Sequence, residues 1–500
     1  MRSSRADEIT SHTAARLCEL VRRRALSPVE IMEAHLQRAE ALNPALNAIV
    51  TFAPDALEQA RAAERAVMRG DNLPPLHGLP VTIKDTIATA NLLTTSGSRA
   101  RSDYVPVVDA PAVARLRAAG AIVYGKTNAS ELAIEYNADN PLFGRTNNPH
   151  DAALTPGGSS GGCAAAVGAC LSPASLGSDL VGSIRIPAHF CGILGLFPTP
   201  GRVPHAGHFP PTEGVLAAGA SLGPLARTVE DLALLFDALT CEDRIQAGSR
   251  ARHQADGSGH ALSETKLRGL RVACYADDGM VRVTEETQHA VASAARALAD
   301  AGMETFEECP PEIAGATDMW LALFTRAVGE IVRAEYAGRE ELAGTAARAI
   351  LRRGEDATDA AAPDAAATVA AAHAGHSDAW AERNRRRASL LERMSETPLL
   401  LTPVGAVAAF AHGARRVEVG GELVNTFRAF SYAQVCNVYG LPGACVPAGR
   451  TREGLPVGVQ IIGRPGEEQL VLAAARVIEA ALGGWQTPPA GLPSGGDDPL

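Results

Sequence analysis

Two serines and one lysine stand in sequence contexts that suit nucleophilic catalysis. Ser159 lies in the run Gly-Gly-Ser-Ser-Gly-Gly at 157–162, and Ser183 follows 24 positions later in a second glycine-containing turn. Lys84 ends the mainly apolar run Leu-Pro-Val-Thr-Ile at 79–83. A serine hydroxyl is almost un-ionised near neutral pH, so it attacks a carbonyl only with a base within reach and with donors for the oxyanion. The two hydroxyls and the amine therefore supply a nucleophile, a proton relay and a base, and they indicate an enzyme.

Lys84 can act as a base only in its neutral form. Its apolar lead-in predicts a buried strand, and burial lowers a lysine pKa by as much as ~3–5 units at fully buried sites. A shift from about 10.4 to about 8 needs roughly 3 kcal/mol of differential destabilisation, which burial supplies. Ser159 then suits a bridging role, because cleavage of an amide requires a proton to travel in both directions. The turn before Ser183 predicts backbone amides that converge on a carbonyl oxygen.

Helical and strand-like segments alternate along the chain and predict an α/β fold. Ser27 and Glu30 form a capping box with proline at the first helical position, which predicts a helix that ends near 43–44. Further helices are predicted at 112–119, 228–239 and 285–300, and strands at 121–124 and 270–275, with a loop at 125–128. Short apolar strands between helices indicate a central sheet that is largely parallel or mixed.

Composition argues against several classes of function. The net charge of −10 disfavours a general nucleic-acid binder, because neutralising phosphates needs a basic face, and the arginine-rich run at 383–387 is expected to be a solvated helix face. No apolar run is long enough to span a bilayer, and acidic residues stand where a signal peptide needs an apolar core, so we expect a cytoplasmic protein. The nine cysteines include no Cys-x-x-Cys pair, so we expect free thiols rather than a zinc site or a disulfide framework.

Three segments together resemble the amidase-signature hydrolases, a family with a Ser–cis-Ser–Lys triad. They are 78–85, the glycine–serine loop at 157–162, and 179–187; similar segments at 125–131, 190–192, 201–204 and 454–460 extend the resemblance from about residue 10 to about residue 482. The resemblance implies an α/β amidase-signature fold, in which a mixed central β-sheet is covered by helices on both faces. We expect a single domain over 1–485, with a catalytic core at about 70–240 and 400–480, a more variable helical and loop excursion at about 242–400, and a flexible tail at 486–500.

The resemblance also assigns roles to individual residues. Ser183 would be the acylated nucleophile, Ser159 the bridging serine, which follows a cis peptide in the family, and Lys84 the general base. Four backbone amides would form the oxyanion hole, those of Leu180, Val181, Gly182 and Ser183. Three side chains would support the site, those of Ser160, Asp179 and Arg185. No metal and no organic cofactor is implied.

Two positions depart from the family pattern. Val181 stands where glycine or alanine is usual, and a valine would be strained by roughly 1–2 kcal/mol or more if the backbone there takes a positive φ. Phe197 replaces a lysine that is usual in the family, which is expected to affect packing more than chemistry. Neither change removes a triad residue.

Three other patterns have more than one interpretation. The run at 157–161 also satisfies the G-x-S-x-G elbow of α/β-hydrolases, with Ser159 as nucleophile, but that motif needs a strand directly before it and 147–156 predicts a loop. His205 and His208 could be metal ligands, but nothing completes a ligand set, so surface histidines are expected. One apolar helical stripe is expected to be core rather than the wall of a substrate pocket: Met319, Trp320, Leu323 and Phe324.

The sequence therefore predicts an amidase that hydrolyses small-molecule amides through an acyl-Ser183 intermediate, with carbamates and esters as further substrates. One alternative is the A subunit of a tRNA-dependent amidotransferase, although 240–244 does not resemble the usual run of that branch. Another is a non-catalytic binding or assembly protein on the same fold, which only Val181 favours. Family members are often dimers, so a homodimer is also considered, and no nucleic-acid or membrane partner is expected.

Overall fold

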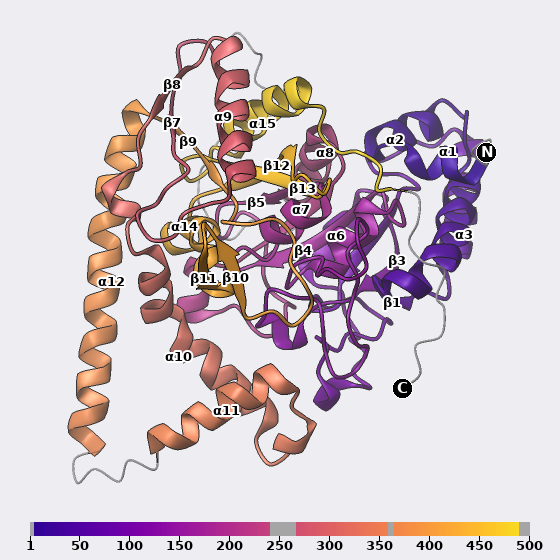
Figure 1. The fold of residues 1–500 in the computed structure, drawn as a ribbon. Helices are drawn as coiled ribbons and strands as arrows, with labels where there is room; N and C mark the ends of the chain where they lie inside the picture. The colour runs from indigo at the N-terminus through magenta and orange to yellow at the C-terminus, as the bar shows by residue number, and fades with distance from the viewer. Residues whose placement is uncertain (1–4, 241–266, 359–364, 490–500) are drawn as a thin grey trace.

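An 11-stranded β-sheet forms the centre of the molecule in the computed structural model, which describes residues 5–240, 267–358 and 365–489 (Figure 1). The strands of this sheet are β1 (Ile49–Phe52), β2 (Pro80–Lys84), β3 (Ile122–Thr127), β4 (Ala174–Asp179), β5 (Leu194–Phe197), β6 (Ser221–Ala226), β7 (Arg271–Cys274), β8 (Glu304–Glu307), β9 (Leu399–Pro403), β12 (Gly443–Arg450) and β13 (Pro456–Ile462). A separate hairpin pairs β10 (Arg416–Val419) with β11 (Glu422–Asn425).

The sheet is mixed, as the sequence predicted. Its order is β1-β3-β2-β4-β6-β5-β12-β13-β9-β7-β8. Strand β2 pairs in parallel with β3 and β4, and β7 pairs in parallel with β8 and β9, whereas the remaining neighbours are antiparallel. The parallel pairs place the carboxyl ends of β2 and β4 at one edge of the sheet.

Helices cover the sheet on both faces. They are α1 (Arg5–Ser11), α2 (Ala14–Arg22), α3 (Pro28–Leu46), α4 (Ala56–Arg69), α5 (Pro111–Ala118), α6 (Gly161–Gly168), α7 (Arg185–Cys191), α8 (Val229–Thr240), α9 (Glu285–Asp300), α10 (Ala316–Tyr336), α11 (Thr345–Thr358), α12 (Ala365–Glu396), α13 (Thr426–Ala429), α14 (Ser431–Tyr439) and α15 (Glu468–Leu482). Successive side chains of a strand point to opposite faces. Accordingly, Ala444 and Val446 of β12 join a core cluster with α9 and α15, whereas Cys445 between them joins a second cluster with α7 and α14.

Most predicted elements are present, with shifts at their ends. The capping box at Ser27 is formed, since Glu30 N donates to Ser27 Oγ at 3.1 Å and Ser27 N donates to Glu30 Oε2 at 2.9 Å. Helix α3 nevertheless continues through Pro44 to Leu46. Strand β3 runs on through 125–127, where a loop was predicted, because that stretch pairs with β1 on one side and β2 on the other. The helix predicted at 285–300 matches α9.

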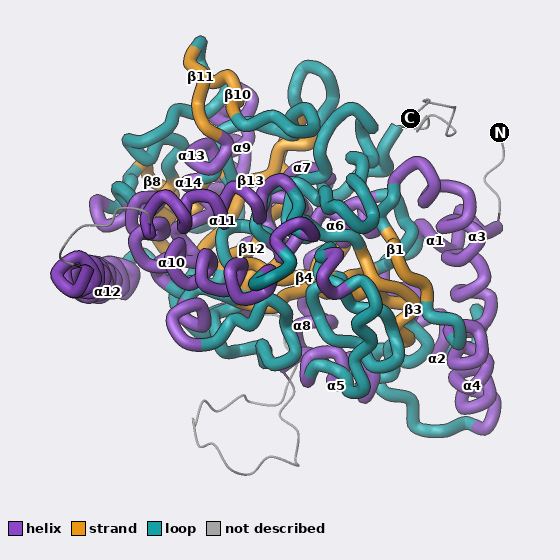
Figure 2. Tube along the Cα trace, turned by 90° about the horizontal axis from the view of Figure 1, so that it is seen from below, coloured by secondary structure: helices purple, strands orange, loops and turns teal. Residues whose placement is uncertain are grey.

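The arginine run on α12 is only partly the solvated face that was predicted. Arg383 Nε donates to the carbonyl oxygen of Val438, and Arg387 Nε donates to that of Tyr439, both at 2.8 Å. These carbonyls end α14, where helix acceptors lack intrahelical partners. The two arginines therefore attach α12 to α14. Helix α12 runs along the outside of the molecule, on the side opposite α1–α3 (Figures 1 and 2).

Several other expectations concern the chain as a whole. The eight cysteines within the described ranges are free, and Cys241 lies outside those ranges. No helix in the part of the chain that is described is long and apolar enough to cross a membrane. Residues 242–266 and 359–364 of the expected excursion, and residues 490–500 of the expected tail, lie outside the described residues.

Candidate active site

Lys84 and Ser159 meet in a buried hydrogen bond at the edge of the sheet. Lys84 is the last residue of β2, and Ser159 lies just before α6, which packs against β2 and β4. The distance from Lys84 Nζ to Ser159 Oγ is 2.6 Å. Lys84 Nζ also lies 2.9 Å from Ser178 Oγ on the neighbouring strand β4. The peptide bond between Gly158 and Ser159 is cis, as the resemblance implies.

The surroundings of Lys84 favour its neutral form. Its side chain is fully buried, and burial lowers the pKa of the amine to about 7. An amine with a pKa near 7 is half neutral at neutral pH and suits general-base work. The sequence-based expectation that a buried strand would depress this pKa agrees in direction.

Ser183 lies in the turn between β4 and α7 and approaches the Ser159 loop through the backbone. Ser160 N donates to the carbonyl oxygen of Ser183 at 3.2 Å. Ser160 Oγ in turn donates to the Ser178 carbonyl at 3.1 Å, so this hydroxyl ties the Ser159 loop to the end of β4. No hydrogen bond joins the hydroxyls of Ser159 and Ser183 in the described chain, but both residues line one cavity.

Asp179 and Arg185 form a buried ion pair beneath the Ser183 turn. Arg185 Nε donates to Asp179 Oδ2 at 3.1 Å, and both side chains are completely shielded from solvent. Burial on its own raises the pKa of Asp179, but the guanidinium charge and the hydrogen bonds outweigh it, so the pKa lies below its ordinary value. Arg185 also donates to Gln460 Oε1 at 2.9 Å and to Asn437 Oδ1 at 2.8 Å. The turn is therefore braced from the C-terminal part of the chain.

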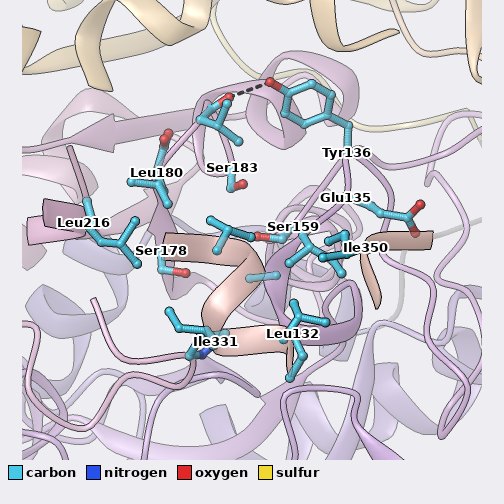
Figure 3. Close-up of a pocket in the computed structure, with 18 of the residues that line it drawn as sticks. Leu132, Glu135, Tyr136, Ser159, Ser178, Leu180, Ser183, Leu216, Ile331 and Ile350 are labelled. Carbon is cyan, nitrogen blue, oxygen red and sulfur yellow. Dashed lines mark hydrogen bonds between the residues drawn. The ribbon is translucent and has the colours of Figure 1, made fainter. Parts of the chain in front are cut away.

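Two aromatic side chains orient the peptide groups before Ser183. Trp320 Nε1 donates to the carbonyl oxygen of Leu180 at 2.9 Å. The Tyr136 hydroxyl donates to the carbonyl oxygen of Val181, also at 2.9 Å (Figure 3). In a trans peptide the N–H points away from the C=O that precedes it. The bond to Leu180 therefore directs the N–H of Val181 away from Trp320, and the bond to Val181 directs the N–H of Gly182 away from Tyr136.

Only part of the predicted oxyanion hole is open. Gly182 N donates to Asp179 Oδ1 at 2.7 Å, so this amide already has an acceptor. Within the described residues, the amides of Leu180, Val181 and Ser183 donate to no protein acceptor. Of the four amides expected to form the hole, one is therefore already hydrogen-bonded and three have no protein acceptor in the described chain.

The two departures from the family pattern leave this geometry intact. Val181 is not among the residues with positive φ, so the strain that a left-handed backbone would impose on valine does not arise. The Phe197 ring lies against the guanidinium of Arg185, with 4.9 Å between its centroid and the guanidinium carbon. Phe197 thus packs on the ion pair, as expected for a packing role.

Replacing Gly182 with alanine is expected to lower kcat by about tenfold or more. Gly182 has a φ of +104°, and a Cβ there would lie 2.6 Å from Ile186 Cδ1 and 2.9 Å from Ala433 Cβ, so the turn must shift. Gly201→Ala is the matched control, since Gly201 has a φ of +87° but open space around its Cβ. Both variants bear a backbone cost of roughly 1–2 kcal/mol, and only Gly182→Ala should lose turnover. Equal losses in steady-state assays would contradict the steric argument.

The site borders a cavity of about 760 Å³ whose walls are mainly apolar. Ser159, Ser178 and Ser183 are among the residues that line it (Figure 3). Apolar side chains surround them, namely Leu132, Leu180, Leu216, Ile331 and Ile350. A cavity of this size and lining accepts a drug-sized apolar group.

The apolar stripe on α10 divides between core and cavity. Leu323 and Phe324 are fully buried core residues, as predicted. Trp320, by contrast, lines the cavity and holds the Leu180 carbonyl. Sequence spacing alone could not separate these positions, because one helical face meets both the core and the cavity.

His208 is buried, contrary to the surface position predicted for it. Its Nε2 lies 2.9 Å from Ser178 Oγ. His205 is only partly buried and also lines the cavity. Sequence reasoning missed Ser178 and the contact of His208, because the two residues stand 30 positions apart and no motif links them. In residues 5–240, 267–358 and 365–489, no group of three or more His, Cys, Asp or Glu side chains is placed to hold a metal ion.

The backbone before Ser159 does not have the strand that a nucleophile elbow requires. An elbow serine follows directly on a strand. Residues 141–157 form turns and loop with a single isolated bridge at Leu154, and Ser159 is followed directly by α6. The strand that the motif requires is therefore missing from this stretch.

Comparison with known proteins identifies the class. The family described as Amidase matches residues 30–472. The A subunit of the glutamyl-tRNA(Gln) amidotransferase of Thermus thermophilus is 35% identical over 488 residues, which cover 92% of this chain and 95% of that protein. The chain belongs to the amidase-signature family of hydrolases.

Solved structures agree with this fold. A structure described as an unexpected vestigial protein complex that reveals the evolutionary origins of an s-triazine catabolic enzyme is similar with a TM-score of 0.83, at 28% identity, over 95% of this chain and 100% of that one. A bacterial aryl acylamidase of the amidase-signature family is similar with a TM-score of 0.79, at 27% identity, over 94% of this chain and 96% of that one. The amidase-signature fold predicted from the three segments is confirmed.

Proposed function

We propose that this protein hydrolyses small-molecule amides that carry a bulky apolar group, through an acyl-enzyme on Ser183. The observation that supports this most is the 2.6 Å contact between Lys84 and Ser159, together with an apolar cavity that both Ser159 and Ser183 line. Carbamates and esters pass through the same tetrahedral chemistry and are included as substrates.

In the proposed mechanism, Ser183 Oγ attacks the substrate carbonyl carbon while its proton passes to Ser159 and the proton of Ser159 passes to neutral Lys84. The amides of Leu180, Val181 and Ser183 stabilise the oxyanion. Lys84 then returns the proton through Ser159 to the departing nitrogen as the C–N bond breaks. A water molecule then attacks the acyl carbon while its proton passes through Ser159 to Lys84. Lys84 returns that proton through Ser159 to Ser183 Oγ as the ester bond breaks and the acid is released.

This mechanism predicts that kcat/KM rises with pH through about 7. Only neutral Lys84 can accept a proton, and because burial lowers its pKa to about 7, the neutral fraction grows about tenfold per unit below that value and levels off above it. Hydrolysis of 4-nitrobutyranilide between pH 5 and 9 would measure this. A flat profile across this range would contradict a base with that pKa.

The test of the function is fluorophosphonate labelling with the modified serine located by peptide mass spectrometry. Label on Ser183 that is lost in Lys84→Ala is expected. Turnover of 4-nitrobutyranilide and 4-nitrophenyl butyrate, which share one acyl group, would then separate amide from ester preference. Label on Ser159 would overturn the assignment, and a folded protein without label or turnover would favour a binding or assembly role.

The second candidate is the A subunit of an amidotransferase, and the identity to the Thermus thermophilus protein supports it. A free amino acid substrate needs charged partners for its ammonium and carboxylate groups. The labelled side chains around the serines are mostly aliphatic (Figure 3), whereas the cavity lining also includes five charged residues, namely Glu135, Asp139, Arg326, Arg333 and Arg415. Hydrolysis of L-glutamine faster than of 4-nitrobutyranilide would favour this candidate.

A further inference from the structure

His208 connects to the lysine of the site through one hydroxyl. Its Nε2 lies 2.9 Å from Ser178 Oγ, and the same Ser178 Oγ lies 2.9 Å from Lys84 Nζ. The other ring nitrogen, Nδ1, lies 2.7 Å from the carbonyl oxygen of Pro210. A buried line of contacts therefore runs from Pro210 through His208 and Ser178 to Lys84, and on to Ser159 at 2.6 Å.

The direction of each hydrogen bond in this line follows from the Pro210 carbonyl, which can only accept. A carbonyl oxygen can only accept, so Nδ1 of His208 carries the proton that points to Pro210. Burial, with a further contribution from the charge of Lys84, lowers the pKa of His208 to about 3, so the ring is neutral and its Nε2 is an acceptor. The Ser178 hydroxyl must then donate to His208, which leaves the lone pairs of Ser178 Oγ for an N–H of Lys84.

The orientation of Lys84 determines what remains for Ser159. A neutral amine has two N–H groups and one lone pair. Ser178 Oγ accepts one N–H at 2.9 Å, and the Ser178 carbonyl accepts the other at 3.5 Å. The lone pair is thus left for Ser159, whose hydroxyl donates to Lys84 and whose own lone pairs stay open to the proton of Ser183.

We propose that His208 is a positioning residue that, through Ser178, fixes the direction of the proton relay from Ser183 to Lys84. This inference rests on the proposed function of the triad. Without an acceptor at His208, the Ser178 hydroxyl can turn and donate to the lone pair of Lys84. It then competes with Ser159 for the only site on the amine that can take a proton.

The experiment is a double-mutant cycle measured with 4-nitrophenyl butyrate. His208→Phe, which keeps a ring but removes the acceptor, should lower kcat by about 10- to 100-fold and leave KM within about twofold, because a misdirected relay affects the chemical step. Ser178→Ala should lower kcat to a similar degree. In the double variant His208→Phe/Ser178→Ala, kcat should be no lower than in Ser178→Ala alone, because His208 acts only through that hydroxyl.

Two further variants separate positioning from packing. His208→Gln, whose side-chain oxygen can accept from Ser178, should recover much of the lost kcat. His77→Phe is the matched control, since His77 is half-buried, bonds a backbone carbonyl at 2.9 Å and lies outside the cavity, so its kcat should equal that of the wild type. Thermal unfolding of each protein checks that it is folded, and if His208→Phe fails to fold, His208→Gln and Ser178→Ala still carry the test.

Multiplicative losses in the double variant, or a raised KM with unchanged kcat, would overturn the inference and make His208 a wall of the cavity. A wild-type kcat in His208→Phe would do the same while the triad assignment stands. Failure of the wild-type protein to label at Ser183 would instead overturn the proposed function itself, so the two failures are distinguishable.

Discussion

Replacing Lys84 with methionine is expected to lower kcat/KM about a thousand-fold, within the range of roughly 10²–10⁴ that a general base contributes. Methionine fills similar space but cannot take the proton that leaves Ser183 through Ser159. The folded protein should be at least as stable as the wild type, because the change removes an amine whose pKa burial depresses. Loss of turnover and of fluorophosphonate label, with an unchanged or higher unfolding temperature, is the expected pair of results.

Lys126→Met is the matched control for this prediction. Lys126 is the other fully buried lysine of the described chain, and it donates to Thr89 Oγ1 at 3.0 Å and to Thr94 Oγ1 at 2.9 Å rather than to a serine of the site. Its removal should cost stability and leave kcat within a few-fold. If both methionine variants lost activity equally, the effect would come from disturbing buried lysines and not from losing a base.

Replacing Arg185 with methionine is expected to destabilise the protein by about 3–5 kcal/mol, because it leaves the buried carboxylate of Asp179 without its charge partner. The change also strands the acceptors on Asn437 and Gln460. Because the native pKa of Asp179 lies below its ordinary value, the stabilisation from the pair is present at neutral pH and is lost as the pH falls through that lowered pKa. Without the guanidinium, burial should raise the pKa of Asp179, so this carboxyl should already be protonated in the variant at pH 4 and the deficit should shrink there.

Urea unfolding at pH 7 and at pH 4 would measure this difference. Arg452→Met serves as the control, because Arg452 forms ion pairs on the surface with a side chain that is 80% exposed. Exposed pairs of this kind often contribute nothing measurable, so its unfolding midpoint should match that of the wild type. A deficit in Arg185→Met that did not depend on pH would argue against the buried charge as its source.

The sequence was sufficient to predict the class of fold and the residues that meet at its edge. Lys84 ends an apolar strand and Ser159 lies in a glycine–serine loop, and these local patterns, together with the family resemblance, carried the prediction. The contact of His208 with Ser178 could not be predicted from the sequence, because it depends on how the loop after β5 folds back over β4. The hydrogen bond from Gly182 N to Asp179 could not be predicted for a similar reason, since only the folded turn brings Asp179 onto that amide.

Element ends were harder to predict than element types. Residues 125–127 contain glycine and lysine and look like a loop, yet they pair on both sides as the end of β3. Pro44 suggested a helix end, but a proline near the last turn of α3 is tolerated because its neighbours complete the turn. At the end of β3, strand pairing therefore outweighs local propensity.

The brace behind the Ser183 turn also has a consequence for the order of biosynthesis. Ribosomes add residues from the N-terminus, so Lys84, Ser159 and Ser183 all emerge long before Asn437 and Gln460. A nascent chain therefore carries every reacting side chain while the guanidinium of Arg185 still lacks two of its acceptors. We therefore expect the Ser183 turn to become fully braced only after β13 has been made, and a premature stop after β9 would leave Arg185 without these two acceptors.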